Sequence, residues 1–296
     1  MRVIIVAVCG VLLVGCGGND EPDEPSLDPE PMTVMTFNVM CSLCGTSEHD
    51  PWEERLEYFR DIFARHDPDL VGIQELTPLG DEVGQLLERL PGRAAVYFAP
   101  ADELPYPDAA IFYRKSRFRL LDSGEYWLSP TPDEPRSTGF AKPQLARLVV
   151  WATLRDRAGD RDFYFATTHF DNNVPSQALS APLVKERTAP FAGKMPVIVT
   201  GDFNSKPGTE AWATLTTDSG GFPLADTHAL AEQWRVISTQ QPEPSYELES
   251  RIDHVFVGGT PGTWAVSDWN VDMSRYGPQD RRPSDHFPIT TRLDYW

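Results

Sequence analysis

Basic side chains are scarce in this chain of 296 residues. It has 26 Lys and Arg against 44 Asp and Glu, a formal net charge of −18 at pH 7. Residues 1–31 carry −5 of that charge, so −13 falls on the rest of the chain. An acidic surface repels phosphate backbones at long range. The charge therefore disfavours a protein that binds nucleic acid tightly, although a nuclease with a local basic cleft and a metal ion stays possible.

The chain also lacks the composition of a fibrous or disordered protein. Its 27 prolines and 21 glycines show no collagen-like or low-complexity excess, and hydrophobic residues make up 41%. That fraction is enough for a sizeable core. No repeat of fixed period and no internal linker follow residue 31, so we expect one domain over residues 32–296.

Long apolar runs are absent apart from Val3 to Val14, which is too short to span a bilayer comfortably. This run follows Arg2 and ends in a Leu-Val-Gly-Cys tetrad at residues 13–16, as in a secretory signal. The tetrad resembles the bacterial lipobox, whose cysteine is lipidated. We therefore expect a lipoprotein signal peptide over residues 1–15 and a lipid anchor on Cys16; an ordinary signal peptide that contains Cys16 is the alternative.

The segment after Cys16 is acidic, rich in proline and nearly devoid of large apolar groups. Such a segment buries too little surface to fold, so we expect residues 16–31 to include the lipidated cysteine and a semi-extended tether. Gly17, rather than Asp, follows the cysteine. By resemblance to lipoproteins, this favours the outer membrane of the bacterial cell envelope.

Only four cysteines are present, and two of them, Cys41 and Cys44, form a CxxC pair. A redox motif would need a thioredoxin-like βαβ unit, and a zinc site would need a second ligand pair; neither is visible. In an oxidising envelope the pair is expected to form a disulfide that stiffens its loop.

Past residue 31, strand and helix patterns alternate. A helix is expected from Pro51, with Asp50 as its N-cap and Glu53 completing a capping box, and it should end near His66. Polar residues 172–177 are expected to form a loop. Further helices are predicted over 79–90 and 209–216, and strands over 33–39, 70–75, 94–98, 109–113, 118–127, 145–154, 162–169, 195–200, 252–257, 264–269 and 287–293. Many strands and few helices indicate two packed sheets with helices outside.

Polar side chains collect where these strands end. Asn38 and Glu75 end the first two strands, His169 ends a later one, and carboxylates and carboxamides recur at 202–204, 253 and 285. Each alone is compatible with a turn. Together they indicate one site, because many polar groups buried without partners would be costly. Hard oxygen ligands fit a divalent cation, and histidines beside it fit proton transfer.

The segments GDFN at 201–204 and SDHFP at 284–288, with the earlier Asn, Glu and His in order, resemble the endonuclease/exonuclease/phosphatase superfamily. The resemblance covers residues 33–293. It implies an α/β (α+β) fold, a four-layer sandwich of two mixed β-sheets flanked by helices.

The resemblance also implies a metal site. Asn38 and Glu75 correspond to metal-site residues, Glu75 being the principal Mg²⁺ ligand, and Asp285 would complete the shell. Mn²⁺ is the alternative ion.

For catalysis, the resemblance makes Asp202 the carboxylate that orients or deprotonates the attacking water. Asn204 would hold Asp202 and the phosphate through its carboxamide. His286 would contact the scissile phosphate, and Asp253 would raise its basicity and fix its tautomer.

His169 and Tyr113 would donate to phosphoryl oxygens. Several members of the superfamily pair this first histidine with a Glu placed before the strand that ends at Tyr113. Here only Asp108 is near, so the protonation role of His169 is less clearly defined than its position.

Few basic residues remain to hold a substrate. The candidates beside the catalytic segments are Arg147, Lys206, Arg251 and Arg282.

The function expected from these residues is a Mg²⁺-dependent, envelope-anchored and monomeric phosphoesterase. It would hydrolyse a phosphodiester or phosphomonoester by in-line attack of water. The ester could belong to a small molecule, a lipid headgroup or a nucleic acid. The alternatives are a secreted nuclease acting on DNA or RNA and, from another class, an inactive anchored binding module.

Overall fold

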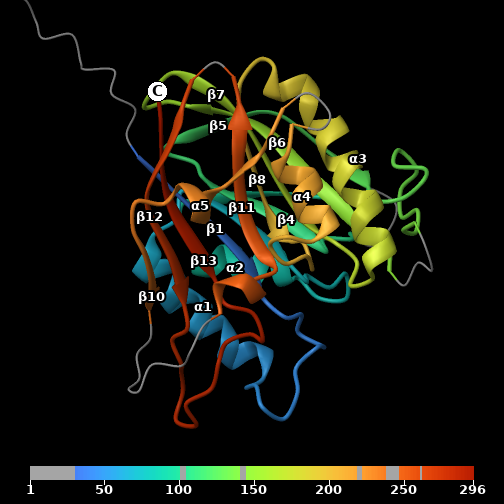
Figure 1. Cartoon of the computed structure of the whole chain (residues 1–296). Helices are drawn as coiled ribbons and strands as arrows, with labels where there is room; N and C mark the ends of the chain where they lie inside the picture. Colours follow the sequence, from blue (N-terminus) through green and yellow to red (C-terminus); the bar gives the residue numbers. More distant parts are fainter. Residues whose placement is uncertain (1–30, 101–104, 141–144, 219–221, 238–246, 261) are drawn as a thin grey trace, which may run out of the picture.

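The computed structural model describes residues 31–100, 105–140, 145–218, 222–237, 247–260 and 262–296 (Figure 1). The predicted signal peptide, the lipidation site at Cys16 and nearly all of the predicted tether lie outside the described residues. Among the described helices, none is long and apolar enough to cross a membrane.

The strands form two mixed β-sheets, with both parallel and antiparallel neighbours in each. The first sheet has seven strands in the order β10 (Trp234–Ile237), β12 (Trp264–Asp272), β13 (Ile289–Tyr295), β1 (Met32–Asn38), β2 (Leu70–Gln74), β4 (Ala109–Arg114) and β3 (Arg93–Tyr97). The second has six strands in the order β5 (Phe118–Trp127), β6 (Leu148–Asp156), β7 (Arg161–His169), β8 (Pro196–Asp202), β11 (Asp253–Gly259) and β9 (Ala225–Asp226).

The two sheets pack face to face over a buried apolar layer. Alternate residues of a strand point to opposite faces, so Val34 and Ile111 of the first sheet meet Phe165 and Ile198 of the second. Burial of this apolar surface, at about 25 cal/mol per Å², is the main force that holds the sheets together.

Helices cover both outer faces, which completes four layers (Figure 1). The helices α1 (Trp52–His66) and α2 (Glu82–Arg89) pack on the first sheet. The helices α3 (Val174–Ala192) and α4 (Glu210–Thr216) pack on the second. The helix α5 (Thr227–Leu230) and the 3₁₀ turn η1 (Leu248–Ser250) are short connectors. The predicted four-layer sandwich is confirmed.

The start of α1 differs from the prediction. Its N-cap is Pro51, and no side chain caps it. Asp50 instead accepts a hydrogen bond of 2.9 Å from the Tyr58 hydroxyl and lies 3.3 Å from Nη1 of Arg281. The prediction of Asp50 as N-cap was wrong because tertiary partners compete for a carboxylate that local spacing assigns to the helix.

The prediction of a polar loop over residues 172–177 is also wrong, because α3 begins at Val174. Asn173 caps α3 by accepting a hydrogen bond from the amide of Ser176, and the helix runs for 19 residues. Two prolines, Pro182 and Pro190, lie inside it, and its apolar residues do not form a single stripe. Helical periodicity was therefore not visible in the sequence, and packing on the second sheet stabilises the helix.

The sheets approach closely at Gly72 of β2. A Cβ atom there would lie 2.2 Å from the Thr200 hydroxyl and 2.4 Å from the Thr167 hydroxyl. Beside it, Gln74 Nε2 donates to Thr167 Oγ1 over 2.9 Å, which links the two sheets. Only glycine fits this contact, and it lies near the edge at which the polar strand ends meet.

A buried ion cluster joins α1 to β12. Asp272 accepts hydrogen bonds from Arg65 over 2.6 Å and from the Ser274 amide over 2.9 Å, and it lies 2.8 Å from Nε2 of His66. Burial alone would raise the pKa of Asp272, but hydrogen bonds from His66 and Ser274 and the charge of Arg65 lower it to about 2. The ionised carboxylate thus stabilises the fold above its unfolded pKa, and this stability is lost as the pH falls toward 2.

We predict that Asp272→Asn lowers the free energy of unfolding at pH 7 by about 2 kcal/mol, since the pKa is lowered from 3.8 to about 2. Urea unfolding from pH 7 to pH 3 should show the difference from wild type narrowing below pH 4. Asp133→Asn is the matched control, because it removes an exposed ion pair with Arg187. Equal losses in the two variants would contradict the prediction.

Candidate active site

The predicted site residues meet at one edge of the two sheets. Asn38 ends β1, His169 ends β7 and Asp202 ends β8. Asp253 begins β11 and pairs with Asp202 across the antiparallel ladder. Glu75 directly follows β2, and His286 precedes β13, which is antiparallel to β1. The polar ends of both sheets therefore form one cluster.

One carboxylate oxygen lies at the centre of this cluster. Oδ2 of the buried Asp202 accepts a hydrogen bond of 3.1 Å from Nδ2 of Asn38. The same atom lies 3.4 Å from Nε2 of His169 and 3.6 Å from Nε2 of His286. The other oxygen, Oδ1, accepts a 2.9 Å bond from the Asn204 amide. Asp202 is thus held in one orientation with three polar side chains around it.

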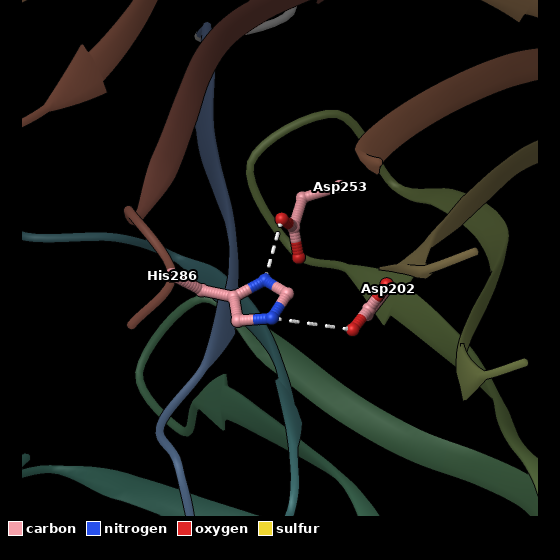
Figure 2. Close-up of side chains that lie close together, drawn as sticks. All are labelled: Asp202, Asp253 and His286. Atoms are coloured by element: carbon pink, nitrogen blue, oxygen red, sulfur yellow. Dashed lines mark hydrogen bonds and ion pairs between the residues drawn. The ribbon is translucent and has the colours of Figure 1, made fainter. Parts of the chain in front are cut away.

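His286 bridges the two aspartates, as Figure 2 shows. Its Nδ1 lies 2.8 Å from Oδ2 of Asp253, and its Nε2 faces Asp202. Burial alone would lower the pKa of His286, but Asp253, with contributions from Asp202 and Asp285, raises it to about 10. The imidazole is therefore cationic at neutral pH, and Asp253 fixes the direction in which its second N–H points.

Two of the three predicted metal residues, Asn38 and Glu75, lie together beside Asp202. Asn38 Nδ2 donates to Glu75 Oε1 over 2.9 Å, and Asn38 Oδ1 accepts from the Met40 amide over 3.0 Å. Ser284 Oγ donates to the Asn38 carbonyl over 2.8 Å, which joins the segment that carries Asp285 to the end of β1. Glu75 has a φ of 62°, a left-handed conformation that is uncommon for this residue. Such local strain is frequent at functional sites.

These residues fit a divalent cation. Asp202, Asp253 and His286 offer atoms that lie within 4.8 Å of one another. A cationic His286 is a poor ligand, however, because both of its ring nitrogens carry protons. Oδ1 of Asp253 is buried without a hydrogen-bond partner in the described residues. The carboxylates of Glu75 and Asp285 provide hard oxygen ligands that suit Mg²⁺ or Mn²⁺.

His169 is held by an arginine and an aspartate. Nη1 of Arg147 lies 2.7 Å from Nδ1 of His169, and Oδ1 of Asp108 lies 3.5 Å from the same nitrogen. Burial would raise the pKa of Asp108, but Arg147 and His169 lower it, so Asp108 stays ionised. Asp108 therefore lies beside His169, where several members of the superfamily have a glutamate. Arg147, which is itself buried, contacts both His169 and Asp108.

Asn204, which lies two residues after Asp202, differs in one detail from its expected role. Asn204 holds Asp202 through its backbone amide, while its carboxamide Nδ2 donates to the Phe170 carbonyl over 3.0 Å. The carboxamide was expected to hold Asp202, and that detail was wrong. Asn204 has a φ of 47°, and the turn that it forms turns its amide back toward the carboxylate. Lys206 is exposed on the same loop.

Tyr113 does not belong to the site. In β4 it pairs with Leu70, whereas Ala109, at the other end of β4, pairs with Gln74 beside Glu75. Tyr113 lies four residues further along β4 than Ala109, a distance of roughly 13 Å. Tyr113 packs in the apolar layer between the sheets. Its predicted role as a phosphoryl donor is wrong because the strand runs away from the site.

Arg251 is also engaged elsewhere. Its guanidinium forms a buried ion pair with Asp226 and donates to the Leu248 carbonyl over 2.9 Å. Both terminal nitrogens of the guanidinium are thus engaged within the fold, so the expected substrate contact of Arg251 is wrong. The predicted substrate residue Arg282, in contrast to Arg251, lines an open cleft together with Asp285.

The structure joins Cys41 and Cys44 in a disulfide, in the loop that follows Asn38. Arg55 of α1, buried under this loop, donates to the carbonyls of Val39 over 2.7 Å, Cys41 over 3.0 Å and Pro283 over 3.1 Å. It thereby connects the segment after β1 to the segment that carries Asp285 and His286. Sequence reasoning missed it, although an arginine on the apolar stripe of α1 was a visible signal.

We predict that Asp253→Asn lowers the pKa of His286 from about 10 toward its ordinary value of 6.5, because it removes the main group that raises it. Histidine-resolved NMR titration in EDTA, with His286→Gln for assignment, measures this. Asp133→Asn should leave the titration as in wild type. An unchanged His286 pKa in Asp253→Asn would contradict the assigned pairing.

The chain resembles known proteins over most of its length. The sequence profile described as Endonuclease/Exonuclease/phosphatase family matches residues 35–286. The mannosyl-6-phosphatase of Bacteroides thetaiotaomicron VPI-5482 is 27% identical with a TM-score of 0.74, over 88% of this chain and 99% of that one. An endonuclease/exonuclease/phosphatase family protein of Bacteroides thetaiotaomicron has 26% identity and a TM-score of 0.75, over 90% and 95% of the two chains.

A curated relative is nocturnin of Rattus norvegicus, 24% identical over 284 residues. This alignment covers 87% of the present chain but 63% of nocturnin, so the chain spans less than two thirds of that relative. The family profile covers most of the chain, the two sheets superpose on family structures, and the polar strand ends meet in one site. On this evidence the chain belongs to the endonuclease/exonuclease/phosphatase family.

Proposed function

We propose that this protein hydrolyses a phosphate ester by in-line attack of water. The observation that carries the proposal is the environment of Asp202 Oδ2, which lies within reach of Asn38, His169 and His286. A buried carboxylate beside two imidazoles, one of them cationic, can accept a proton while its neighbours stabilise negative charge.

Each side chain then has a role that follows from its contacts. Asp202 orients the attacking water and accepts its proton. His286, cationic and aligned by Asp253, holds a phosphoryl oxygen, and His169, held by Arg147 and Asp108, faces the same position from the other sheet. Glu75, with Asn38 and Asp285, would bind Mg²⁺ or Mn²⁺. The bound ion would neutralise charge that develops on the phosphoryl group.

The substrate favoured by this proposal is a small phosphate monoester, such as a sugar phosphate. The likeness to a mannosyl-6-phosphatase supports it. The net charge of −18 disfavours a long nucleic acid. A nuclease acting on DNA or RNA is the second candidate, since the site chemistry suits diesters and monoesters alike. We propose monomeric action with it.

We predict that Asp202→Ala and His286→Ala each lower kcat/KM by about 100-fold or more, the range typical of lost acid–base groups. The assay compares mannose 6-phosphate, p-nitrophenyl phosphate, bis-p-nitrophenyl phosphate, sphingomyelin, plasmid DNA and RNA, with Mg²⁺, Mn²⁺ or EDTA. EDTA should abolish turnover, and monoesters should be hydrolysed faster than diesters.

Asp133→Ala, which removes an exposed carboxylate distant in sequence from the site, is the matched control and should behave as wild type. Faster hydrolysis of plasmid DNA or RNA would favour the nuclease. Absence of turnover on every substrate, together with no Mg²⁺ binding by calorimetry, would leave the inactive anchored binding module.

We also propose that the protein is a lipoprotein anchored through Cys16 in the bacterial cell envelope, more specifically in the outer membrane. The Leu-Val-Gly-Cys tetrad and the acidic tether after it support this. A cysteine that carries several acyl chains anchors stably, whereas one chain binds reversibly.

Cys16→Ala should move the full-length protein from the membrane fraction to the soluble fraction when it is expressed in a bacterial host. Mass spectrometry should show that the N-terminal peptide of this variant lacks the mass of the acyl chains. Cys9→Ala is the matched control, since Cys9 lies inside the expected signal peptide and should change neither result. Membrane retention of Cys16→Ala would contradict the anchor.

A further inference from the structure

A polar cleft adjoins the segment that carries Asp285 and His286. It has a volume of about 550 Å³, and its lining includes His49, Arg275, Arg281, Arg282 and Asp285. We call it the arginine cleft. Asp285, one of the predicted metal residues, lines the cleft, and Arg282 lies two residues before Ser284, which bonds the Asn38 carbonyl. The cleft therefore adjoins the segment that carries His286.

Arg282 is the central feature of the cleft. Its guanidinium carbon lies 4.6 Å from the centre of the Phe287 ring, a contact that holds the side chain in place. Its Nε is buried without a hydrogen-bond partner among the described residues. Burial and the nearby charge of Arg275 lower its pKa, and no carboxylate compensates for them. Arg282 thus has no ion pair with a carboxylate in the described part of this acidic chain.

The other cations of the cleft are fixed by the protein. Arg281 lies 3.3 Å from Oδ1 of Asp50 and donates to the His49 carbonyl over 2.9 Å. Arg275 donates to the Asp280 carbonyl over 3.1 Å. Glu48 and Asp280 also line the cleft, so its affinity for an anion depends on Arg282 rather than on an excess of positive charge.

A phosphate or carboxylate satisfies these features. An arginine fork binds either group through two parallel N–H···O bonds, which are stronger than neutral hydrogen bonds. The anion would give Arg282 Nε a partner and would reduce its repulsion with Arg275. The size of the cleft admits such a group together with part of the molecule that carries it.

We propose that the arginine cleft binds a second anionic group of the substrate, so that the preferred substrate is a phosphate ester with two negatively charged groups. This inference rests on the proposed function for the reacting phosphate. It adds Arg282, supported by Arg275, as the residue that selects the second anion.

The test compares glucose 1,6-bisphosphate with glucose 6-phosphate, using phosphate release with Mg²⁺ in the full domain. Wild type should have a kcat/KM at least about tenfold higher for the bisphosphate, since each tenfold corresponds to about 1.4 kcal/mol. In Arg282→Gln the ratio of the two kcat/KM values should fall toward one. In Arg157→Gln the ratio should stay as in wild type, because Arg157 lies beyond the end of β6 that is opposite the site.

Binding of glucose 1,6-bisphosphate in EDTA, followed by calorimetry, separates this proposal from the proposed function. Weaker binding in Arg282→Gln than in Arg157→Gln supports the cleft even if no substrate is hydrolysed. Equal kcat/KM values for the two sugars in wild type, or equal affinities in the two variants, would overturn the proposal.

Discussion

The burial of one carboxylate, Asp202, constrains the whole edge of this molecule. An ionised group removed from water needs donors and opposite charge around it. These partners come from four separate segments: hydrogen bonds from Asn38 of the first sheet and from the Asn204 amide, and the nearby imidazoles of His169 in the second sheet and His286 before β13. They reach the same point only if the two sheets keep their alignment, which the close contact at Gly72 imposes.

A second buried charge supports the first. Arg55 places a cation among three carbonyl groups beneath the site. Burial lowers its pKa to about 10, although the charges of Glu82, Asp285 and Glu75 act in the opposite direction. It therefore remains charged at neutral pH, and its fork holds the disulfide loop against the loop of Asp285 and His286. The candidate metal residues are positioned by this contact as much as by the strands that carry them.

The candidate active site and the arginine cleft are both built on the segment that Arg55 holds, which carries Arg282, Asp285 and His286. Asp285, proposed to bind the metal, also lines the cleft whose cations are proposed to bind a second anion. An ester held at both ends would be oriented before reaction, and such orientation lowers the barrier by reducing the entropy lost in the transition state. The acidic remainder of the surface would then repel long polyanions, while the arginines of the cleft bind a small anion.

The sequence alone determined most of the strands, the layering and most of the site, but it gave no sign of β9 or β10. Strand ends are local features: Asn38, Glu75, Asp202 and His286 follow or precede apolar runs, and parallel strands bring their ends to one edge. Direction along a strand and competition between partners are not local. Only the tertiary structure decided that Tyr113 lies away from the site on β4 and that Arg251 is paired with Asp226. It also decided that Asp50 accepts a hydrogen bond from Tyr58 rather than capping α1. It also decided α3, because the packing that stabilises this proline-containing helix is provided by the second sheet.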